Sequence, residues 1–241
     1  MTKSAIFISD IHLGCSPPHA IPNREEMLTQ KLKEWQSSAS HVFLLGDVFE
    51  FWMEYKDFIP KESFWFLAEL KNLVAAGVEV HYLPGNHDFN LGEFFSKELG
   101  LVVHKDEIQI TTQGKKLYLI HGDGIAKSDW KYRIVKRIIK HPISNWCYKL
   151  LHPDWGMALA RFVSQTSRDH GSDETTPYNE YETAAWELLE KNNADIIIHG
   201  HTHRPHIKTQ GNKIYANSGQ WLFATTFLEL KDGSLSSHIL S

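Results

Sequence analysis

The chain has 241 residues, of which 42% are hydrophobic and 12% aromatic, which suits one large domain with a sizeable core. Its net charge of −4 gives no general attraction for nucleic acid, and Cys15 and Cys147 are too few to build a disulfide-stabilised secreted domain. No apolar run approaches the roughly 20 residues of a membrane span, and the N-terminus lacks the apolar core of a signal peptide. We therefore expect a soluble protein of the reducing cytoplasm that binds no nucleic acid.

Five short apolar runs, rich in β-branched residues, are typical of strands buried on both faces. They span 5–9, 41–46, 78–84, 116–121 and 194–200. Helical patterns occupy 24–37 and 61–76, and the C-terminal part alternates like a meander of strands. Strand–helix alternation followed by strands predicts a layered α/β sandwich. Because about 124–192 is helical and separates two strands, we predict an insertion within a single domain spanning 1–241.

Polar side chains follow each of the five predicted strands. They are Asp10 and His12; Asp47; Asn86, His87 and Asp88; His121 and Asp123; and His199, His201 and His203. Ligand sites in open α/β sheets lie beyond the carboxyl ends of the strands, so these clusters should converge. We expect the remaining histidines, among them His41, His81 and His104, to be ordinary surface or core residues.

Carboxylate, amide and imidazole side chains together suit Mn²⁺, Fe²⁺, Zn²⁺ or Co²⁺. Three carboxylate or amide residues and four imidazoles from these clusters make seven ligands, which exceed the need of one ion with open positions. Two ions that share a bridging carboxylate fit this number. Asp88 directly follows His87, and we expect it to orient that imidazole.

The ordered stretches DIH, GDVFE, GNHD, HGD and GHTH, between positions 10 and 203, resemble the calcineurin-like metallophosphoesterase superfamily. The resemblance implies a four-layer αββα sandwich and two divalent metal ions, with Mn²⁺ the first choice. It implies that Asp10, His12, Asp47 and His203 hold one ion. It further implies that Asp47, Asn86, His121 and His201 hold the other, and that His87 acts as general acid or as a donor to the transition state.

A narrower resemblance, carried by FLLGDVFEFW, Asp129 after HGD, the helical insertion and IHGHTHRP, is to UDP-2,3-diacylglucosamine hydrolases. Those enzymes cleave the pyrophosphate of a nucleotide-linked glycolipid, a lipid A precursor, to UMP and 2,3-diacylglucosamine 1-phosphate. The resemblance implies that the insertion is a cap for the acyl chains. The implied substrate-binding residues are Asn86, His87, Asp129, Ser167, Arg168 and His201.

The chain differs from that family at His87, where Arg is common, and after Ser167, where Arg168 stands without the family's Asn and Lys. An alkoxide leaving group needs a general acid more than a phosphate does. A general phosphodiesterase or phosphatase therefore stays open as an alternative. A non-catalytic scaffold is a third possibility, against which the complete ligand set argues.

The insertion begins with a basic amphipathic stretch. Between 127 and 140 it holds six basic residues and one acid, with apolar side chains at helical spacing. We predict that Trp130, Ile134, Ile138 and Trp146 form the wall of an acyl-chain site. Basic helices with Trp also bind anionic membrane surfaces, so peripheral attachment to the inner face of the cytoplasmic membrane is a second expectation, with Lys131, Lys136 and Lys140 supplying the attraction. The simpler alternative is that this stripe and a second apolar stripe within 143–151 pack on the domain or on each other.

Overall fold

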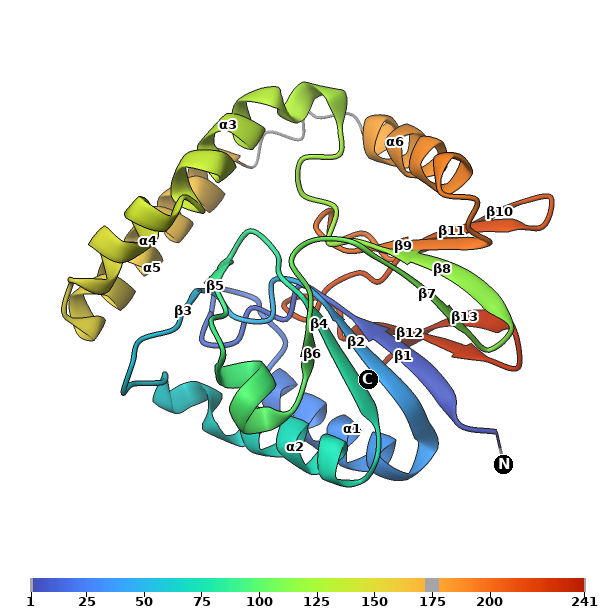
Figure 1. The fold of residues 1–241 in the computed structure, drawn as a ribbon, viewed down its shortest axis with the longest axis horizontal. Coiled ribbons are helices and arrows are strands. Elements are labelled where there is room, and N and C mark those ends of the chain that lie inside the picture. Colours follow the sequence, from blue (N-terminus) through green and yellow to red (C-terminus); the bar gives the residue numbers. More distant parts are fainter. Residues whose placement is uncertain (1, 172–177, 241) are drawn as a thin grey trace.

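The computed structural model describes residues 2–171 and 178–240, and two β-sheets packed face to face form its centre (Figure 1). The first sheet has the order β13-β12-β1-β2-β4-β6, and the second has the order β10-β11-β9-β8-β7. The strands of the first are β1 (Ser4–Ile8), β2 (Ala39–Leu45), β4 (Glu79–Leu83), β6 (Val102–Val103), β12 (Thr226–Lys231) and β13 (Ser234–Ile239). Those of the second are β7 (Ile108–Thr112), β8 (Lys115–Leu119), β9 (Ile196–His199), β10 (His206–Gln210) and β11 (Lys213–Asn217).

Parallel pairing brings the carboxyl ends of the central strands to one edge. Strands β1, β2, β4 and β6 are parallel neighbours, and so are β8 and β9. A small separate pair, β3 (Trp52–Met53) and β5 (Asp88–Asn90), joins the loops that follow β2 and β4. The loops after five of the long strands therefore lie at the same end of the sandwich.

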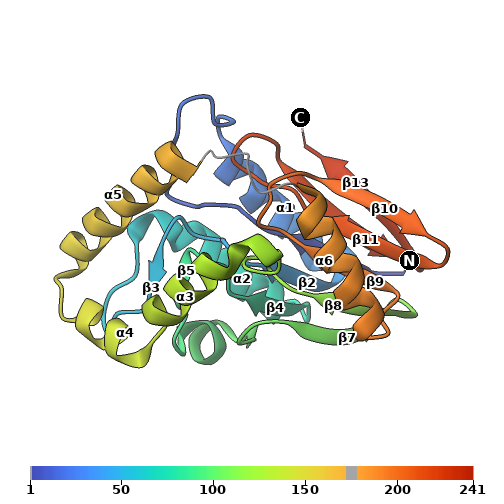
Figure 2. The same cartoon turned by 90° about the horizontal axis from the view of Figure 1, so that it is seen from above.

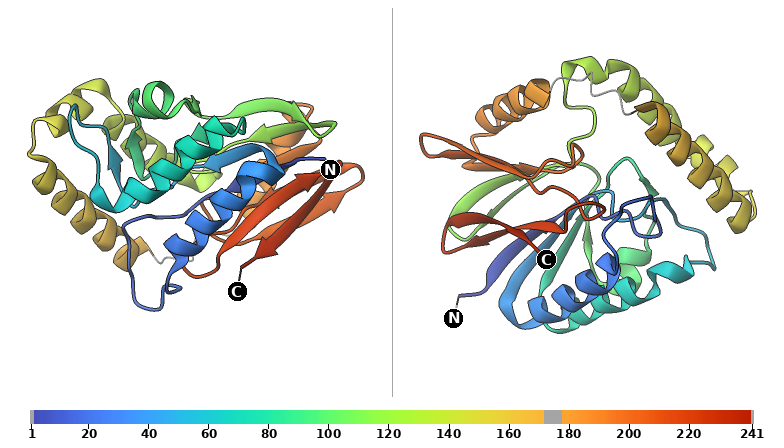
Figure 3. Two further views of the ribbon diagram at one scale, coloured as in Figure 1. Left: turned by 90° about the horizontal axis from the view of Figure 1, so that it is seen from below. Right: turned by 180° about the vertical axis from the view of Figure 1, so that it is seen from behind.

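Helices cover the outer faces of both sheets. Helices α1 (Arg24–Ser38) and α2 (Phe64–Ala75) lie on the first sheet (Figure 3), and α6 (Tyr178–Lys191) lies on the second. Apolar cores fill all three interfaces: Leu32 of α1 and Leu70 of α2 pack on the first sheet, Phe43 and Leu119 lie between the sheets, and Leu189 of α6 packs on the second sheet. The predicted four-layer αββα sandwich is confirmed.

Three helices stand away from the sandwich, beyond the strand ends (Figure 2). They are α3 (Trp130–Ile139), α4 (Pro142–Lys149) and α5 (Pro153–Gly171), and we call them the cap. The expected insertion at 124–192 is therefore too long at its C-terminal end, because α6 packs against β9 and β11 and completes the sandwich. Among the described residues, no helix is both long and apolar enough to cross a membrane.

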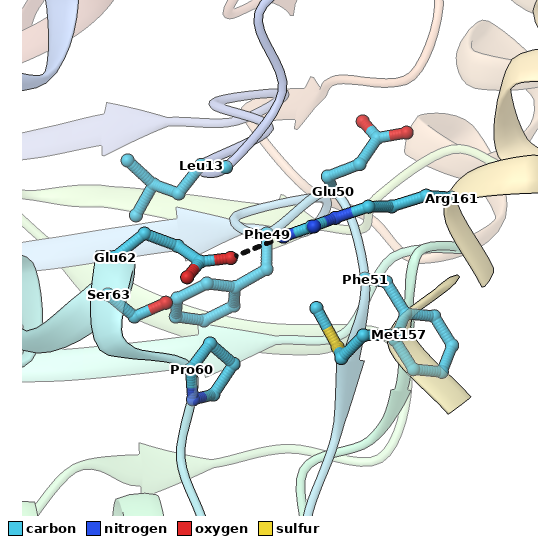
Figure 4. A pocket seen from close by; sticks show the side chains of 10 residues that line it. Leu13, Phe49, Glu50, Phe51, Pro60, Glu62, Ser63, Met157 and Arg161 are labelled. Carbon is cyan, nitrogen blue, oxygen red and sulfur yellow. Dashed lines mark hydrogen bonds and ion pairs between the residues drawn. The ribbon is translucent and has the colours of Figure 1, made fainter. Parts of the chain in front are cut away.

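Helix α5 of the cap contacts the sandwich near the start of α2 (Figure 4). The Arg161 guanidinium of α5 lies 2.8 Å from the Glu62 carboxylate, and Met157 of the same helix lines the small pocket beside Phe49 and Phe51.

Candidate dinuclear metal centre

All seven predicted metal ligands lie in loops just beyond the carboxyl end of a strand, three strands coming from the first sheet and two from the second. Five of the seven have a backbone φ in the left-handed region, between 49° and 63°: Asp10, His12, Asp47, His201 and His203. Such a conformation costs about 1–3 kcal/mol for a residue other than glycine and persists at functional sites where the surroundings enforce it. The loops are therefore shaped to aim these side chains.

The first group of ligands is Asp10, His12 and His203, whose ligand atoms all lie within 4.8 Å of one another. Asp10 Oδ1 lies 3.1 Å from His203 Nε2. The other oxygen, Oδ2, accepts hydrogen bonds from the backbone N–H of His201 and from the Ser9 hydroxyl. One carboxylate oxygen is thus held in place while the other faces the imidazoles.

The second group gathers around Asn86. Its Oδ1 lies 3.1 Å from His121 Nε2 and 3.1 Å from His201 Nδ1. Asp47 Oδ2 lies 3.4 Å from His121 Nε2. Because Asp47 also falls in a group with His12 and His87, it is placed between the two halves of the site, as a bridging ligand requires.

Unsatisfied polar atoms show that the site fits cations. Among the described residues, His12 Nε2 is buried without a hydrogen-bond partner, and the only polar neighbour of buried Asp10 Oδ1 is the His203 imidazole, at 3.1 Å. A buried polar atom without a partner costs about 1–3 kcal/mol. Oxygen and imidazole donors in two adjacent groups suit two borderline divalent ions, which would satisfy these atoms.

The buried imidazoles of the site differ in pKa. Burial alone would lower the pKa of His121, but the carboxylates of Asp47 and Asp10 outweigh it and raise the pKa to about 10. Burial and the neighbouring His121 lower the pKa of His201 to about 4. Without metal, His121 therefore holds a proton that a cation must displace, while His201 is already neutral.

The structure gives His87 and Asp88 separate tasks. The Nδ1–H of His87 donates to the carbonyl of Glu50 at 2.8 Å, which leaves Nε2 for a substrate. Asp88 does not orient this ring, contrary to our expectation. Its buried Oδ2 accepts from the backbone N–H groups of Asp47 and Gly85, at 2.8 and 3.0 Å, and so fixes the loops that carry two ligands.

Two glycines allow these loops to approach the ligands closely. A Cβ added at Gly85 would collide with the carboxylate and backbone of Asp47, and one at Gly200 would collide with Ser9 and the Asp10 carboxylate. The space is already filled by ligand side chains. No other residue type fits at either position without displacing a ligand.

A cavity of about 400 Å³ opens beside the metal centre, between the sandwich and the cap. Its polar end contains Asn86 and His87, together with Lys136 of α3 and Lys140, which directly follows that helix. The rest is apolar and aromatic, and is lined by Phe51, Phe89, Val135, Ile139, Tyr148, Leu159 and Val163.

The prediction that Trp130, Ile134, Ile138 and Trp146 line this cavity is wrong. All four are more than half exposed, and none belongs to the wall. One residue turns a helix by about 100°, so the stripe of 130, 134 and 138 is centred about 120° around α3 from 135 and 139. The apolar stripe that we chose faces outward.

Two lysines assigned to membrane attraction instead hold the cap on the active-site loops. Lys136 Nζ lies 2.6 Å from Asp123 Oδ2, which also accepts from the Tyr132 hydroxyl at 2.6 Å. Lys140 Nζ donates to the carbonyl of Gly85 at 3.1 Å. Lys131 is exposed and lies over Trp130.

Three other predicted substrate-binding residues, Asp129, Ser167 and Arg168, lie directly before the cap helices or within them. Asp129 stands directly before α3 and accepts a hydrogen bond from the Tyr181 hydroxyl at 2.9 Å. Ser167 and Arg168 belong to α5, but their side chains lie outside the described part of the structure.

Sequence reasoning gave no role to Glu50, whose Oε2 lies 3.3 Å from His12 Nδ1. A carboxylate on the far nitrogen of a ligating imidazole fixes its orientation and raises its basicity. The signal was an acidic residue inside the apolar stretch VFEFW, where burial of a charge calls for a partner.

Carboxylate and imidazole groups gathered at the strand ends of an αββα sandwich are the features of a metal-dependent hydrolase. The family described as calcineurin-like phosphoesterase matches residues 4–205. The chain belongs to this family, and it is a hydrolase of phosphoric esters that binds divalent metal.

Similar proteins agree with this assignment. A UDP-2,3-diacylglucosamine hydrolase of Porphyromonas gingivalis is 35% identical over 178 residues, which cover 73% of this chain and 68% of that protein. The enzyme of the same name from Vibrio vulnificus strain YJ016 is 31% identical over 207 residues, covering 85% and 82%. A solved archaeal phosphodiesterase shares the fold with a TM-score of 0.50 and 14% identity, over 98% of this chain and 99% of that one.

Proposed function

We propose that the chain hydrolyses the pyrophosphate bond of UDP-2,3-diacylglucosamine and releases UMP and 2,3-diacylglucosamine 1-phosphate. The observation that carries this proposal is the cavity between cap and sandwich. Its polar end adjoins Asn86 and His87, and the remainder is apolar and aromatic. A phosphorylated head group with attached acyl chains needs both parts, whereas a small diester needs only the first. The curated relatives carry this activity in their names.

Each group at the polar end has a task in this reaction. Two bound ions, for which we propose Mn²⁺ ahead of Fe²⁺, Zn²⁺ or Co²⁺, supply an activated water and neutralise phosphate charge. Asn86, His87 and Lys140 line the place where the phosphates lie, and they stabilise charge on the phosphate oxygens. The ordered carbonyl contact at Nδ1 keeps the His87 ring in one orientation. We retain Asp129, Ser167, Arg168 and His201 as further substrate contacts.

A second candidate, a phosphodiesterase acting on a more basic leaving group, is favoured by His87 itself. A protonated imidazole can pass a proton to an alkoxide, and such acid catalysis contributes about 10²–10⁴-fold. Under this candidate, His87→Ala should reduce the hydrolysis of alkyl esters far more than that of p-nitrophenyl esters. Equal losses on both esters indicate charge stabilisation and favour the pyrophosphatase.

The outward face of the cap suits a membrane surface. Trp130 and Ile138 of α3 and Trp146 of α4 are each more than half exposed. Lys131 and Arg137 are exposed on the same helix, α3. We propose that this face rests on anionic lipid at the cytoplasmic side of a membrane, where the glycolipid is found. Sedimentation with anionic vesicles should be weakened by Ile138→Asp and by added salt, and little changed by Ile139→Asp.

The substrate assignment is tested by comparing UDP-2,3-diacylglucosamine with UDP-glucosamine that lacks acyl chains. Products are identified by mass spectrometry, and kcat/KM is measured for both compounds with Mn²⁺-loaded protein in detergent. We expect UMP from the acylated compound and a value of kcat/KM at least tenfold lower for the other, since each buried CH₂ contributes about 0.8 kcal/mol. Equal kcat/KM values for the two compounds would overturn the assignment and favour the second candidate.

A further inference from the structure

A second group of imidazoles lies toward the amino-terminal ends of β2 and β4, away from the dinuclear centre. His41 on β2 is the register partner of Glu79 on β4, and His81 follows two residues later on the same face. The ligand atoms of the three residues lie within 4.8 Å of one another. His41 Nε2 lies 3.7 Å from Glu79 Oε2, and His81 Nε2 lies 3.0 Å from Glu79 Oε1. Two imidazoles thus converge on the two oxygens of one carboxylate.

The opposite nitrogen of each imidazole is already engaged. His41 Nδ1 lies 3.0 Å from the Ser40 hydroxyl oxygen, and His81 Nδ1 lies 3.0 Å from His104 Nε2. Histidines that bind metal usually have their second nitrogen held in this way, which fixes the ring and the tautomer. The arrangement leaves both Nε2 atoms directed at Glu79.

The burial of His81 is a second observation that favours a ligand here. It is only 4% exposed, and its Nε2 faces Glu79 without the directed geometry of a hydrogen bond. Among the described residues, this nitrogen is therefore one of the buried polar atoms that lack a hydrogen-bond partner. A cation placed between the three side chains would satisfy it.

We propose that His41, Glu79 and His81 bind one divalent transition-metal ion of the Zn²⁺ class. Two imidazole nitrogens and one carboxylate are a recognised protein ligand set for zinc, with water in the fourth position. Ligands about 2.0–2.2 Å from a tetrahedral ion are about 3.3–3.6 Å apart, close to the separations present here before any adjustment. Because half of the Glu79 side chain is exposed, solvent reaches the fourth position.

The ion would connect two neighbouring strands and take no part in the hydrolytic reaction. His41 and Asp47 are six residues apart along an extended segment, which corresponds to roughly 20 Å. This site is therefore separate from the dinuclear centre and does not rest on the proposed substrate. Binding to the folded state alone would stabilise the sandwich.

The test is Zn²⁺ stoichiometry, measured by elemental analysis after dialysis of the full chain against buffered Zn²⁺. We expect three ions per chain in the wild type and the loss of one ion in His41→Gln and in Glu79→Gln. These two positions are chosen because His81 is buried and its replacement could prevent folding. His238→Gln is the matched control, since His238 Nε2 also pairs with a glutamate, Glu229, at 3.2 Å on the same sheet but without a second imidazole.

Three outcomes overturn the proposal. They are two ions in the wild type, three ions retained in both His41→Gln and Glu79→Gln, or loss of the third ion in His238→Gln. The proposal stands if the third ion disappears only with the residues of the His41 group.

Discussion

Two neighbouring isoleucines of α3 provide the sharpest test of the acyl-binding cavity. Ile139 lines the cavity, whereas Ile138 is 61% exposed on the outward face of the cap. We expect Ile139→Asp to damage the hydrolysis of the acylated substrate selectively. The same substitution at Ile138 places the same charge one residue away, about 100° around the helix, and should leave catalysis in detergent unchanged.

The size of the effect follows from the lost contact. An acyl chain gains about 0.8 kcal/mol for each buried CH₂, and a side chain of this size covers two or three of them, so the loss is about 2 kcal/mol. That corresponds to roughly a 30-fold decrease in kcat/KM. A carboxylate facing hydrocarbon adds to this loss.

The assay compares UDP-2,3-diacylglucosamine in detergent micelles with bis(p-nitrophenyl) phosphate, for both variants and the wild type. The small diester needs only the metal centre, so it should be hydrolysed at wild-type rates by both variants. Equal loss on the two substrates in Ile139→Asp would indicate damage to the metal centre. A larger loss of acylated turnover in Ile138→Asp would refute the assignment of the two faces.

Further predictions concern the loops, the buried histidines and the cap. Gly85→Ala should reduce Mn²⁺ content and activity together, because a Cβ would collide with the bridging Asp47; elemental analysis showing full metal would contradict this. Burial lowers the pKa of His199 to about 4, so the unfolded state binds more protons than the folded state between about pH 6.5 and 4. Urea unfolding of metal-free protein should therefore show stability falling as pH decreases through this window, by up to about 3 kcal/mol from His199, and His199→Gln should remove that share. Lys140→Met should lower the free energy of unfolding by about 1 kcal/mol because it loses the bond to the Gly85 carbonyl, while the exposed Lys131→Met should change it by less than about 0.5 kcal/mol.

The metal centre was predictable because parallel strands impose a shared edge. Once the strands ending before Asp10, Asp47 and Asn86 were recognised, their loops had to meet, whatever the details of packing. His121 and His201, which follow strands of the second sheet, lie in the same group as Asp47 and Asn86. Backbone conformation was not predictable, since Asp and His adopt a left-handed φ more often than most residues but still only rarely.

The cap was harder to predict because its helix α3 is apolar on two faces. Helical spacing identifies a stripe, but it does not say whether the stripe meets a cavity or solvent. Val135 and Ile139 face inward, and Ile134 and Ile138 face outward, although all four are aliphatic. The same ambiguity misassigned Lys136, which turns toward Asp123. The end of the insertion was misplaced for a related reason, because α6 follows the cap in sequence yet packs on the second sheet.

The bridging role of Asp47 is the centre of this account, and metal content tests it most directly. Mn²⁺ per chain is measured by elemental analysis for the wild type, Asp47→Ala and His12→Ala, each shown to unfold cooperatively. We predict that Asp47→Ala lacks both ions of the dinuclear centre, because both groups lose their shared ligand, and that His12→Ala lacks one of them, because only the first group is weakened. Undiminished metal in Asp47→Ala would contradict the dinuclear centre described here.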